Sequence, residues 1–441
     1  MAMNIHLIAG ARPFERAMKP VRWAFSSHGI ANLTLPWLAG LIPPRHHVTI
    51  QDEQVAPLDL GAPMDLALIT AKTCYAPRAY AVAATLRARG VPVVMGGCHA
   101  SLYPDEVQGH VDSVVLGEAE PIIQQLLFDA ADGCLQARYI GGAVSFDGLP
   151  LPRRDLLPKR YIIDAVHASR GCSHSCGFCC MRSVYGPGYR ARPVGETIDE
   201  LRGLSPYLGF HDENLVADRE HARELFTAMI PLGKLWMGQA SVDIMEDPEL
   251  IELAGRAGCT GFLTGMETIS QANLVAANKT QNDVAAYGAM IQACHEAGIA
   301  VGAAMLFGLD HDTPDSFAET VQAMHDLEVD QAYFKIVTPY PGTRYFDELA
   351  AQGRILTRDW QYYDGCFPVF EPLHLTPRQL FEGACWARQE FYRYRHVARR
   401  MRNVRRLRLP WWAQLNMNRL ARDAFADGEP WGERLLQEIE A

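Results

Sequence analysis

Short runs of apolar, β-branched residues alternate along most of the chain with longer stretches in which apolar residues recur at helical spacing. This alternation is typical of βα units built around a parallel sheet. In the first part of the chain, strands are expected at residues 5–9, 47–51, 65–70, 92–95 and 113–116. A helix is predicted over 77–89, because its apolar residues form one stripe and Gly90 follows as a stop. The pattern predicts an α/β fold that opens with a five-stranded, doubly wound parallel sheet, whose ligands would bind at the carboxyl ends of the strands.

A segment rich in glycine and proline, residues 141–158, has no helical period and predicts a linker. A second βα series follows, with strands expected at 162–168, 208–211, 234–237, 261–264, 299–305 and 333–337. Its helices are expected at 196–204, 219–230, 248–257, 282–297, 314–327 and 343–352. Six βα units favour a partial (β/α)6 barrel, although periodicity alone does not separate a barrel from a flat sheet. The expected domains are residues 1–150, residues 161–358 and a helical, basic C-terminal region, 359–441.

Composition narrows the class of protein. The 441 residues are 49% hydrophobic and 21% charged, which excludes disordered, collagen-like and coiled-coil proteins. A net charge of -10 gives no overall footprint for nucleic acid. The N-terminal residues lack the basic and apolar regions of a secretory signal, and no apolar run is long enough to span a membrane, so the expected location is the cytoplasm. Eleven cysteines, an odd number, favour thiols or metal ligands over a disulfide framework.

One segment departs from the overall acidity. Residues 388–408 hold nine arginines and one glutamate, interleaved with Phe391, Tyr392 and Tyr394 and followed by Trp411 and Trp412. A solvated helix that covers the mouth of the barrel would explain this composition. Contact with nucleic acid phosphates or with an anionic membrane surface would explain it as well. All three interpretations stay open at the level of sequence.

The most informative motif lies directly after an expected strand, where Cys172, Cys176 and Cys179 have the spacing C-x3-C-x2-C. Three thiolates on one tight loop can hold three corners of a four-iron four-sulfur cluster. The fourth iron would then have no protein ligand and could bind a substrate, as an open coordination position does in catalytic metal sites. The motif therefore predicts a catalytic iron-sulfur centre.

Two other interpretations of the motif are weaker. A structural zinc site commonly has four ligands in two separated pairs, and three metal-free buried thiols seldom cluster. A second pair is missing here, since the later cysteines are isolated: Cys259, Cys294, Cys366 and Cys385. Cys180 adjoins the motif, but adjacent residues of an extended segment point to opposite sides. We therefore expect Cys180 to have a packing role, with a ligand or redox role as the alternative.

At these residues the chain resembles radical S-adenosylmethionine (SAM) enzymes, over about residues 166–344. In that superfamily the cysteine motif ligates the cluster, the open iron chelates the amino and carboxylate groups of SAM, and reductive cleavage gives a 5'-deoxyadenosyl radical. The segments 302–308 and 338–343 resemble two further strand-end motifs of the superfamily. The resemblance implies these contacts with SAM: Phe178 against adenine, Asp212, Glu213 and Asn214 toward the ammonium group, and Glu267 near the cofactor. An acidic helix N-terminal turn is the alternative for Asp212 and Glu213.

Paired glycines end a strand at 93–97, and a similar turn ends the next strand at 114–118. Glycine there lets a backbone approach a bulky ligand, although a tight structural turn is the alternative. The region 1–150 resembles the cobalamin-binding domain fused to many radical SAM enzymes, in the branch of the anaerobic protoporphyrin-ester cyclase and carbon methylases. The implied cobalamin contacts are Thr70, Gly96, Gly97, His99, Ser101, Gly117 and Glu118. The motif that supplies a lower axial histidine is absent, so His99 is either a contact or a satisfied loop histidine.

The resemblance implies an enzyme that methylates an unactivated carbon of a small-molecule or lipid-like substrate. One SAM would methylate cobalamin and a second would supply the radical, with electrons from a donor such as flavodoxin or ferredoxin. Three alternatives stay open: a radical cyclase or rearrangement enzyme without methyl transfer, a methylthiotransferase, and a non-catalytic iron-sulfur or cobalamin sensor. The methylthiotransferase would need a second cluster on Cys74, Cys98 and Cys134.

Overall fold

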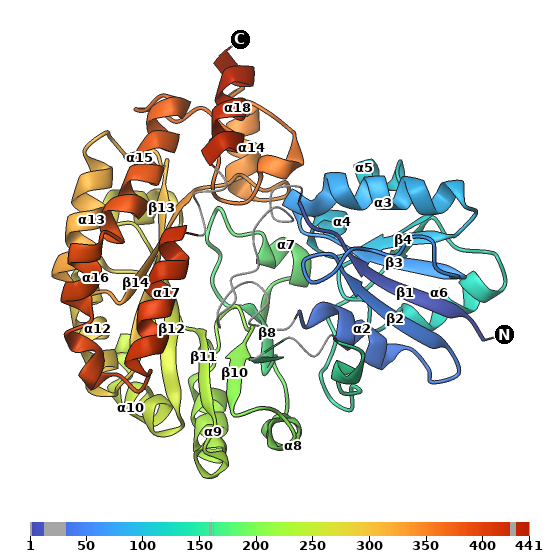
Figure 1. Cartoon of the computed structure of the whole chain (residues 1–441), viewed down its shortest axis with the longest axis horizontal. Coiled ribbons are helices and arrows are strands. Elements are labelled where there is room, and N and C mark those ends of the chain that lie inside the picture. The colour runs from blue at the N-terminus through green and yellow to red at the C-terminus, as the bar shows by residue number, and fades with distance from the viewer. Residues whose placement is uncertain (1, 13–31, 158–160, 162, 424–428, 441) are drawn as a thin grey trace.

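The computed structural model describes residues 2–12, 32–157, 161, 163–423 and 429–440. Two six-stranded sheets and one two-stranded sheet form its framework. Figure 1 shows the N-terminal sheet on one side of the molecule and the second, curved sheet with its helices on the other. The α/β fold expected from the sequence is confirmed.

The N-terminal sheet has the strand order β2-β1-β3-β4-β5-β6, and all its neighbouring strands are parallel. Its strands are β1 (Asn4–Ala9), β2 (His47–Asp52), β3 (Leu66–Thr70), β4 (Val93–Gly96), β5 (Ser113–Leu116) and β6 (Arg138–Ile140). The expectation of five strands was wrong by one. The missed strand, β6, is three residues long with both ends exposed, so it has neither the length nor the burial pattern that reveals a strand in sequence.

Helices cover both faces of this sheet, as a doubly wound fold requires. They are α2 (Thr34–Leu41), α3 (Ala76–Ala88), α4 (Cys98–Leu102), α5 (Pro104–Gln108) and α6 (Ile123–Ala131). Ile5 and Leu7 of β1 pack with residues of α2 and α6, whereas Ile8 packs with residues of α3 and α5. This split follows from the alternation of side chains along a strand.

The second sheet is also parallel and has the order β14-β13-β12-β11-β10-β7. Its strands are β7 (Asp164–Val166), β10 (Tyr207–Phe210), β11 (Leu235–Gln239), β12 (Cys259–Glu267), β13 (Ala300–Phe307) and β14 (Gln331–Ile336). The helices between them are α7 (Met181–Tyr185), α8 (Val194–Arg202), α9 (Arg219–Met229), α10 (Pro248–Arg256), α11 (Gln271–Ala276), α12 (Tyr287–Glu296) and α13 (Ser316–Asp326), and α14 (Arg344–Ala351) follows β14. Successive strands are neighbours, as in a partial barrel.

The first strand of this series differs from the expectation. One strand was expected over 162–168, but β7 ends at Val166 and a separate strand, β8 (Ser169–Cys172), leaves the sheet and pairs antiparallel with β9 (Gly188–Ala191). Gly171 has a φ of +81°, and a Cβ there would lie 2.4 Å from the Gly188 carbonyl oxygen. The hairpin therefore depends on a glycine beside the first cysteine of the motif. Residue 162 and the linker residue 158 lie outside the described residues.

The C-terminal region is helical, as expected, with α15 (Pro377–Phe391), α16 (Tyr394–Arg400), α17 (Trp411–Asp423) and α18 (Glu429–Glu440). Its first helix, α15, packs against the edge strand β14. Just after α15, the Tyr392 hydroxyl donates to the Ala332 carbonyl at 2.9 Å and accepts from the Ala332 amide at 3.1 Å, which protects the edge strand β14. Gln414 of α17 donates to the Asp330 carbonyl, at the amino end of β14. Among the described residues, no helix has the length and apolar character needed to cross a bilayer.

Candidate active site

The cysteine motif forms a loop between β8 and α7, at the carboxyl end of the second sheet. Two distant segments fix its middle: the Gly177 amide donates to the Ala277 carbonyl at 2.8 Å, and the Tyr345 amide donates to the Gly177 carbonyl at 3.0 Å. The Asn278 side chain donates to the Ser175 carbonyl at 2.7 Å. The loop is therefore held from both sides before any cofactor binds.

The three thiols lie on one short loop, where burial and the thiols of Cys176 and Cys172 raise the pKa of Cys179. Burial and the neighbouring Cys176 thiol raise the pKa of Cys172, and the Gln281 amide donates to the Cys176 sulfur at 3.4 Å. Among the described residues, no three His, Cys, Asp or Glu side chains lie close enough together to bind a single metal ion. Ligands at three corners of a cubane stand further apart than ligands of one ion, so this donor set fits a four-iron four-sulfur cluster with one open iron.

The acidic segment after β10 braces this loop. Asp212 is fully buried and accepts hydrogen bonds from the Ala168 amide and the Ser169 hydroxyl. The Glu213 carboxylate accepts from the Gly171 amide at 3.0 Å, directly before Cys172. Burial raises the pKa of Asp212 to about 7, even though Ser169 donates to it. Both carboxylates position the β8 backbone, and their contact with SAM stays a prediction.

Other predicted side chains are placed differently. The Asn214 amide donates to the Ser241 hydroxyl at 2.9 Å and its oxygen accepts from the Ser241 amide. The acidic N-terminal turn expected for the following helix is formed by Asp218, which accepts from the amides of Glu220 and His221. Asn214 therefore links two strand ends, and the helix cap is supplied further along the chain.

Glu267 ends β12 in a left-handed conformation, with a φ of +68°. Its carboxylate accepts from Lys279 at 2.7 Å, and the Lys279 ammonium lies 5.9 Å from the centre of the Phe178 ring. Although burial opposes a charge there, Glu267 and the thiols of Cys176 and Cys179 raise the pKa of Lys279. Lys279, which sequence reasoning missed, thus links Glu267 at the end of β12 to Phe178 within the cysteine loop.

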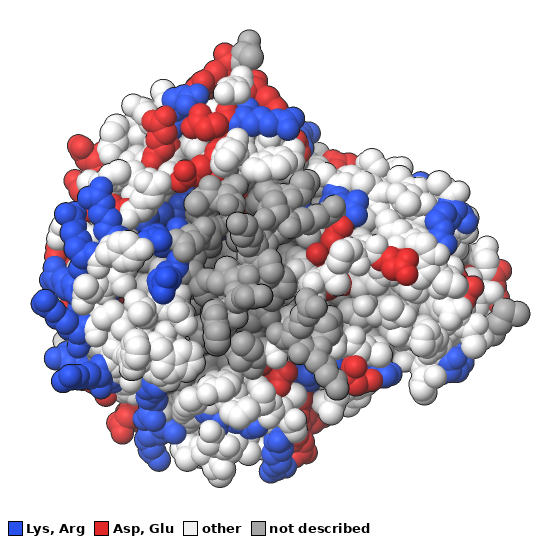
Figure 2. Space-filling view, viewed as in Figure 1, with Lys and Arg blue, Asp and Glu red and all other residues white. Residues whose placement is uncertain are grey.

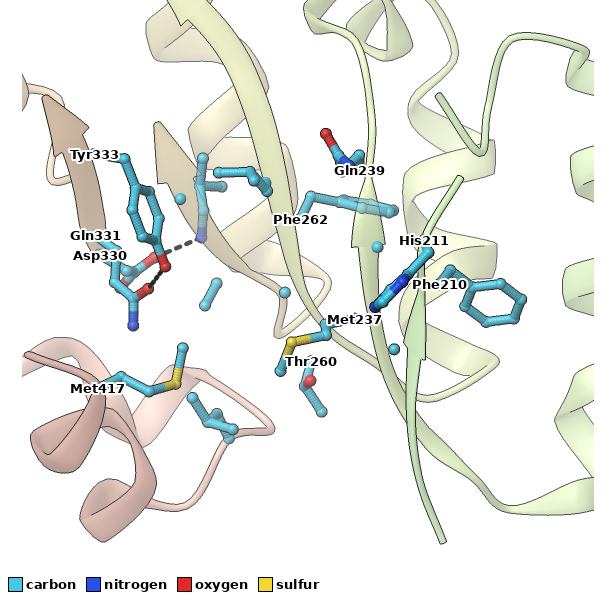
Figure 3. A pocket seen from close by; sticks show the side chains of 18 residues that line it. Phe210, His211, Met237, Gln239, Thr260, Phe262, Asp330, Gln331, Tyr333 and Met417 are labelled. Atoms are coloured by element: carbon cyan, nitrogen blue, oxygen red, sulfur yellow. Dashed lines mark hydrogen bonds between the residues drawn. The ribbon is translucent and has the colours of Figure 1, made fainter. Parts of the chain in front are cut away.

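A cavity of about 200 Å³ lies between the strands of the partial barrel (Figure 3). Its wall is mainly apolar, and small residues on successive strands leave it room: Gly209, Gly238, Gly261 and Gly302. His211 and Gln239 line it near the carboxyl ends of β10 and β11. Leu409 and Met417 contribute to the wall from the C-terminal region. Tyr333 donates to the Gln331 side-chain oxygen at 2.7 Å, which leaves the buried Gln331 amide nitrogen without a partner.

The carboxyl edge of the N-terminal sheet faces the cysteine loop. The Gly342 position lies against Leu102 and Ser183, and the Gly117 position lies near Val184 of α7. Cys180 directly precedes α7 on this boundary, where burial and the nearby Cys98 thiol raise its pKa to about 12. The two sheets therefore present their carboxyl ends to each other, with the cysteine loop between them.

The glycine turns of this edge are braced together. Gly97 has a φ of +93°, and a Cβ there would lie 2.6 Å from the Thr70 hydroxyl. The Ser101 hydroxyl donates to the Gly97 carbonyl at 3.0 Å and accepts from the Gly117 amide at 2.9 Å. A Cβ at Gly96 would make only ordinary van der Waals contacts with Val115. The turn itself explains Gly97, and the bracing places Thr70, Ser101 and both glycine turns on one edge.

His99 is fully buried behind that edge. Its Nε2 lies 2.9 Å from the Tyr80 hydroxyl, which donates to Glu106, and the indole nitrogen of Trp360 donates to the same carboxylate at 2.7 Å. Burial lowers the pKa of His99 to about 4, despite the carboxylate of Glu106 nearby. The ring is therefore bonded at Nε2 within the protein, and a contact of His99 with cobalamin stays a prediction.

Glu118 is used inside the protein. It accepts hydrogen bonds from Arg170 at 3.0 Å and from Arg190 at 2.6 Å, while Arg170 also donates to Glu120 at 2.6 Å. The Arg170 guanidinium lies 5.0 Å from the Trp37 ring centre. Since Arg170 precedes Gly171 and Cys172, this buried network joins the N-terminal sheet to the cysteine loop. Glu118 therefore positions Arg170 and Arg190, and its contact with cobalamin stays a prediction.

The second cluster of a methylthiotransferase has no place in the described chain. Cys74 and Cys98 follow β3 and β4 at the carboxyl edge of the N-terminal sheet. Cys134 is exposed and precedes β6, at the amino edge. The three thiols therefore lie at opposite ends of a parallel sheet and do not share a ligand.

Comparison with known proteins agrees with the geometry. Residues 166–324 match the model of the radical SAM superfamily. The chain is 30% identical over 370 residues to the bacteriochlorophyllide d C-8(2)-methyltransferase of Chlorobaculum tepidum, with 78% of this chain and 82% of the relative covered. The chain belongs to the radical SAM superfamily. Membership makes it an enzyme whose cofactors are a four-iron four-sulfur cluster and SAM.

Two further similarities extend over most of the chain. It is 29% identical over 413 residues to the bacteriochlorophyllide d C-12(1)-methyltransferase of the same organism, with 88% of each chain covered. It is also similar to the structure of the cobalamin-dependent S-adenosylmethionine radical enzyme OxsB with aqua-cobalamin and SAM bound. That match has a TM-score of 0.71 at 13% identity and covers 96% of this chain and 72% of the other. At this identity the likeness shows the fold alone, including both sheets.

Sequence reasoning missed several residues that act at this radical SAM site. Lys279 and Gln281 contact the site from a loop about a hundred positions after the cysteines, and Arg170 meets Glu118 from 52 positions away. The arginine directly before Gly171 and Cys172 was visible as part of the motif, but nothing marked its partner. For Lys279 no signal in a single sequence was available, because its role depends on the return of β12 to the same end of the barrel.

Proposed function

We propose that this chain is a cobalamin-dependent radical SAM methyltransferase that acts on an unactivated carbon of an apolar small molecule. The observation that carries the proposal is the placement of the cysteine loop between the carboxyl ends of two parallel sheets. In α/β sheets, that edge is where ligands bind. The two bacteriochlorophyllide d methyltransferases, aligned over most of this chain, support methyl transfer as the reaction.

The residues present fit cobalamin on the N-terminal side. The strand order places the topological switch between β1 and β3, so the switch lies beside Thr70 at the end of β3. Ser101 holds the Gly97 and Gly117 turns together, which leaves a braced backbone edge toward the cysteine loop. We propose that Thr70, Gly96, Gly97, Ser101 and Gly117 form the cobalamin contacts. His99 and Glu118 would support this edge from behind.

On the barrel side, we propose Cys172, Cys176 and Cys179 as the cluster ligands. When bound, the cluster supplies the electron that cleaves SAM, and cobalamin supplies a methyl carrier. Asp212 and Glu213 hold the β8 backbone so that the three thiols keep one geometry. The Lys279–Glu267 pair fixes the side of the loop next to Phe178. Such positioning restricts the ligands before they bind, and it lowers the cost of ordering them.

The cavity supports an apolar substrate. Its wall combines glycines with Phe262, Leu263 and Met237, so it would exclude water around an apolar group of the substrate. The partnerless Gln331 amide nitrogen would donate to one acceptor on the substrate. Two relatives are named for bacteriochlorophyllide d, which makes this tetrapyrrole the first substrate to test. A small external protein such as a flavodoxin or ferredoxin would supply the electrons.

The proposal is tested by anaerobic purification followed by iron counting and extraction of cobalamin. About four irons per chain and one corrin are expected, because one cluster has four irons. Incubation with SAM, reductant and bacteriochlorophyllide d should yield 5'-deoxyadenosine, S-adenosylhomocysteine and a methylated tetrapyrrole. One control incubation omits the tetrapyrrole, and a second replaces the enzyme with its Cys176→Ala variant.

Each product separates this proposal from its rivals. 5'-Deoxyadenosine without S-adenosylhomocysteine would favour the radical cyclase or rearrangement enzyme, a possibility supported by 26% identity over 368 residues to the anaerobic magnesium-protoporphyrin IX monomethyl ester cyclase of Cereibacter sphaeroides. Absence of both products from a sample with its full iron content would contradict catalysis by this centre.

A further inference from the structure

A basic and aromatic surface lies between α16 and α17. We define the Arg–Trp surface by six exposed side chains: Arg399, Arg402, Arg405, Arg406, Trp411 and Trp412. Trp411 is 63% exposed and Trp412 is 47% exposed. A tryptophan side chain in water forfeits the largest apolar burial that any residue offers, so two adjacent exposed tryptophans require a reason.

The segment beneath this surface is firmly packed. Arg400 is buried, lies 4.0 Å from the Phe391 ring centre, and donates to the Phe391 carbonyl at 3.0 Å and to Asn418 at 2.8 Å. Val404 and Leu409 are buried as well. The backbone that bears the two tryptophans is therefore well ordered. Neighbouring residues are buried in the core, and the two tryptophan side chains stay exposed to solvent.

The charge of this region is one-sided. From residue 391 to residue 422 the sequence has ten arginines and no acidic residue, in a chain whose net charge is -10. Nearby Arg393 and Arg395 pair with Glu390. Among the described side chains, no ion pair is found for the four arginines of the Arg–Trp surface. Figure 2 shows Lys and Arg gathered on the side of the molecule where Figure 1 places α16.

The same segment forms part of the barrel cavity. Leu409, two residues before Trp411, and Met417 of α17 line the cavity wall. One face of the segment therefore borders the apolar cavity, and the other presents tryptophan and arginine. Figure 3 shows Met417 pointing from this helix toward the barrel strands.

We propose that the Arg–Trp surface docks on an anionic lipid bilayer. Indole rings are stable at the level of the lipid headgroups, where one edge meets apolar chains and the N–H meets water. Exposed arginines are attracted to anionic headgroups and strengthen such binding. A bilayer satisfies the aromatic and the cationic groups together, and it places the cavity wall next to a medium that dissolves apolar substrates. Nucleic acid would satisfy the charges, but it would give no reason for the link to an apolar cavity.

The test is sedimentation of the full-length chain with vesicles. Phosphatidylcholine vesicles should leave the protein in the supernatant, whereas vesicles containing about one third phosphatidylglycerol should sediment it, with less binding at high salt. Trp411→Ser/Trp412→Ser and Arg402→Gln/Arg405→Gln/Arg406→Gln should each weaken partitioning by about tenfold. A blue shift of tryptophan emission on binding should be smaller in the tryptophan variant.

The matched control variant removes the same number of positive charges at other places on the molecular surface. Arg87→Gln/Arg138→Gln/Arg202→Gln removes three exposed arginines outside the Arg–Trp surface and should bind like the unchanged protein. Far-ultraviolet circular dichroism checks that every variant is folded. Equal binding by the control and surface variants would overturn the proposal.

Two other occupants are outcomes of the same experiment. Tight binding of a fluorescent single-stranded oligonucleotide, without sedimentation on anionic vesicles, would overturn the proposal in favour of nucleic acid. A dimer that the tryptophan variant dissociates, again without vesicle binding, would overturn it in favour of a second copy. Because every readout is binding, failure here leaves the proposed methyl transfer unaffected.

Discussion

The two carboxyl edges that meet at the candidate site are built on opposite plans. On the barrel side, carboxylates such as Asp212 and Glu213 hold the backbone, which leaves Cys172, Cys176 and Cys179 for a cofactor. On the side of the N-terminal sheet, the polar side chains closest to the edge are occupied by protein partners: His99 by Tyr80, and Glu118 by two arginines. What this second edge presents is mainly backbone at glycine turns.

This difference indicates how the protein would recognise the two cofactors. An iron-sulfur cluster is held by cysteine thiolates, so its ligands can be recognised in the sequence as closely spaced cysteines. A large corrin can be held by shape and by many backbone contacts, so its residues lie in common turn patterns. Substitutions at the two edges should therefore have different effects.

The cysteines should be individually essential. Cys172→Ala, Cys176→Ala and Cys179→Ala should each abolish 5'-deoxyadenosine formation, because a cluster with two protein ligands loses its fixed geometry. Cys180→Ala should keep its iron content and its SAM cleavage, since Cys180 directly precedes α7 beside Cys98. Iron analysis and mass spectrometry measure both. Cleavage in any of the first three variants would refute the ligand assignment.

The buried network should matter for stability. Glu118→Gln leaves the Arg170 and Arg190 guanidinium groups with less compensation in a buried place, and should cost about 3 kcal/mol. Asp155→Asn breaks the exposed pair with Arg153 and should cost less than about 0.5 kcal/mol. Chemical denaturation compares the two variants. Similar losses would show that the network does not join the two parts of the molecule.

Buried His99 should make the protein less stable in acid. Because burial lowers its folded pKa to about 4, from 6.5, the folded state binds fewer protons than the unfolded state. Its contribution is complete above pH 6.5 and is lost as the pH falls toward 4, by about 2 kcal/mol at pH 5. His99→Gln should reduce the difference between the free energy of unfolding at pH 7.5 and that at pH 5. His47→Gln, at an exposed position, is the control and should preserve that difference.

The glycine edge should be sensitive to one methyl group. Gly97→Ala combines a positive φ with a Cβ 2.6 Å from the Thr70 hydroxyl, and should reduce retained cobalamin by about tenfold. Gly90→Ala has a similar φ of +77° but meets no atom within 4 Å, so it should lose only about 1 kcal/mol of stability and keep cobalamin. Corrin absorbance after gel filtration reports retention. Equal retention by the two variants would remove the N-terminal edge from the proposed site.

Much of the framework was predictable from sequence. The five longer strands of the N-terminal sheet were predicted because alternating burial leaves a period in the sequence, whereas the short β6 leaves none. The cysteine spacing indicated the iron-sulfur centre, since one loop of eight residues contains all three ligands. The β8–β9 hairpin was not predicted, because the close approach of Gly171 to the Gly188 carbonyl exists only in the folded chain.

By itself, the sequence determined the order of the βα units, the cysteine loop and the basic, aromatic segment near the C-terminus, because each depends on residues that are neighbours in the chain. Tertiary structure alone decided that Lys279 meets Glu267 beside Phe178, that Arg170 meets Glu118, and that α17 borders the cavity. The physical reason is that parallel strands return the chain to the same edge after each helix. Residues far apart in sequence then meet there, and only their positions in space show whether a polar group is already bonded or still available.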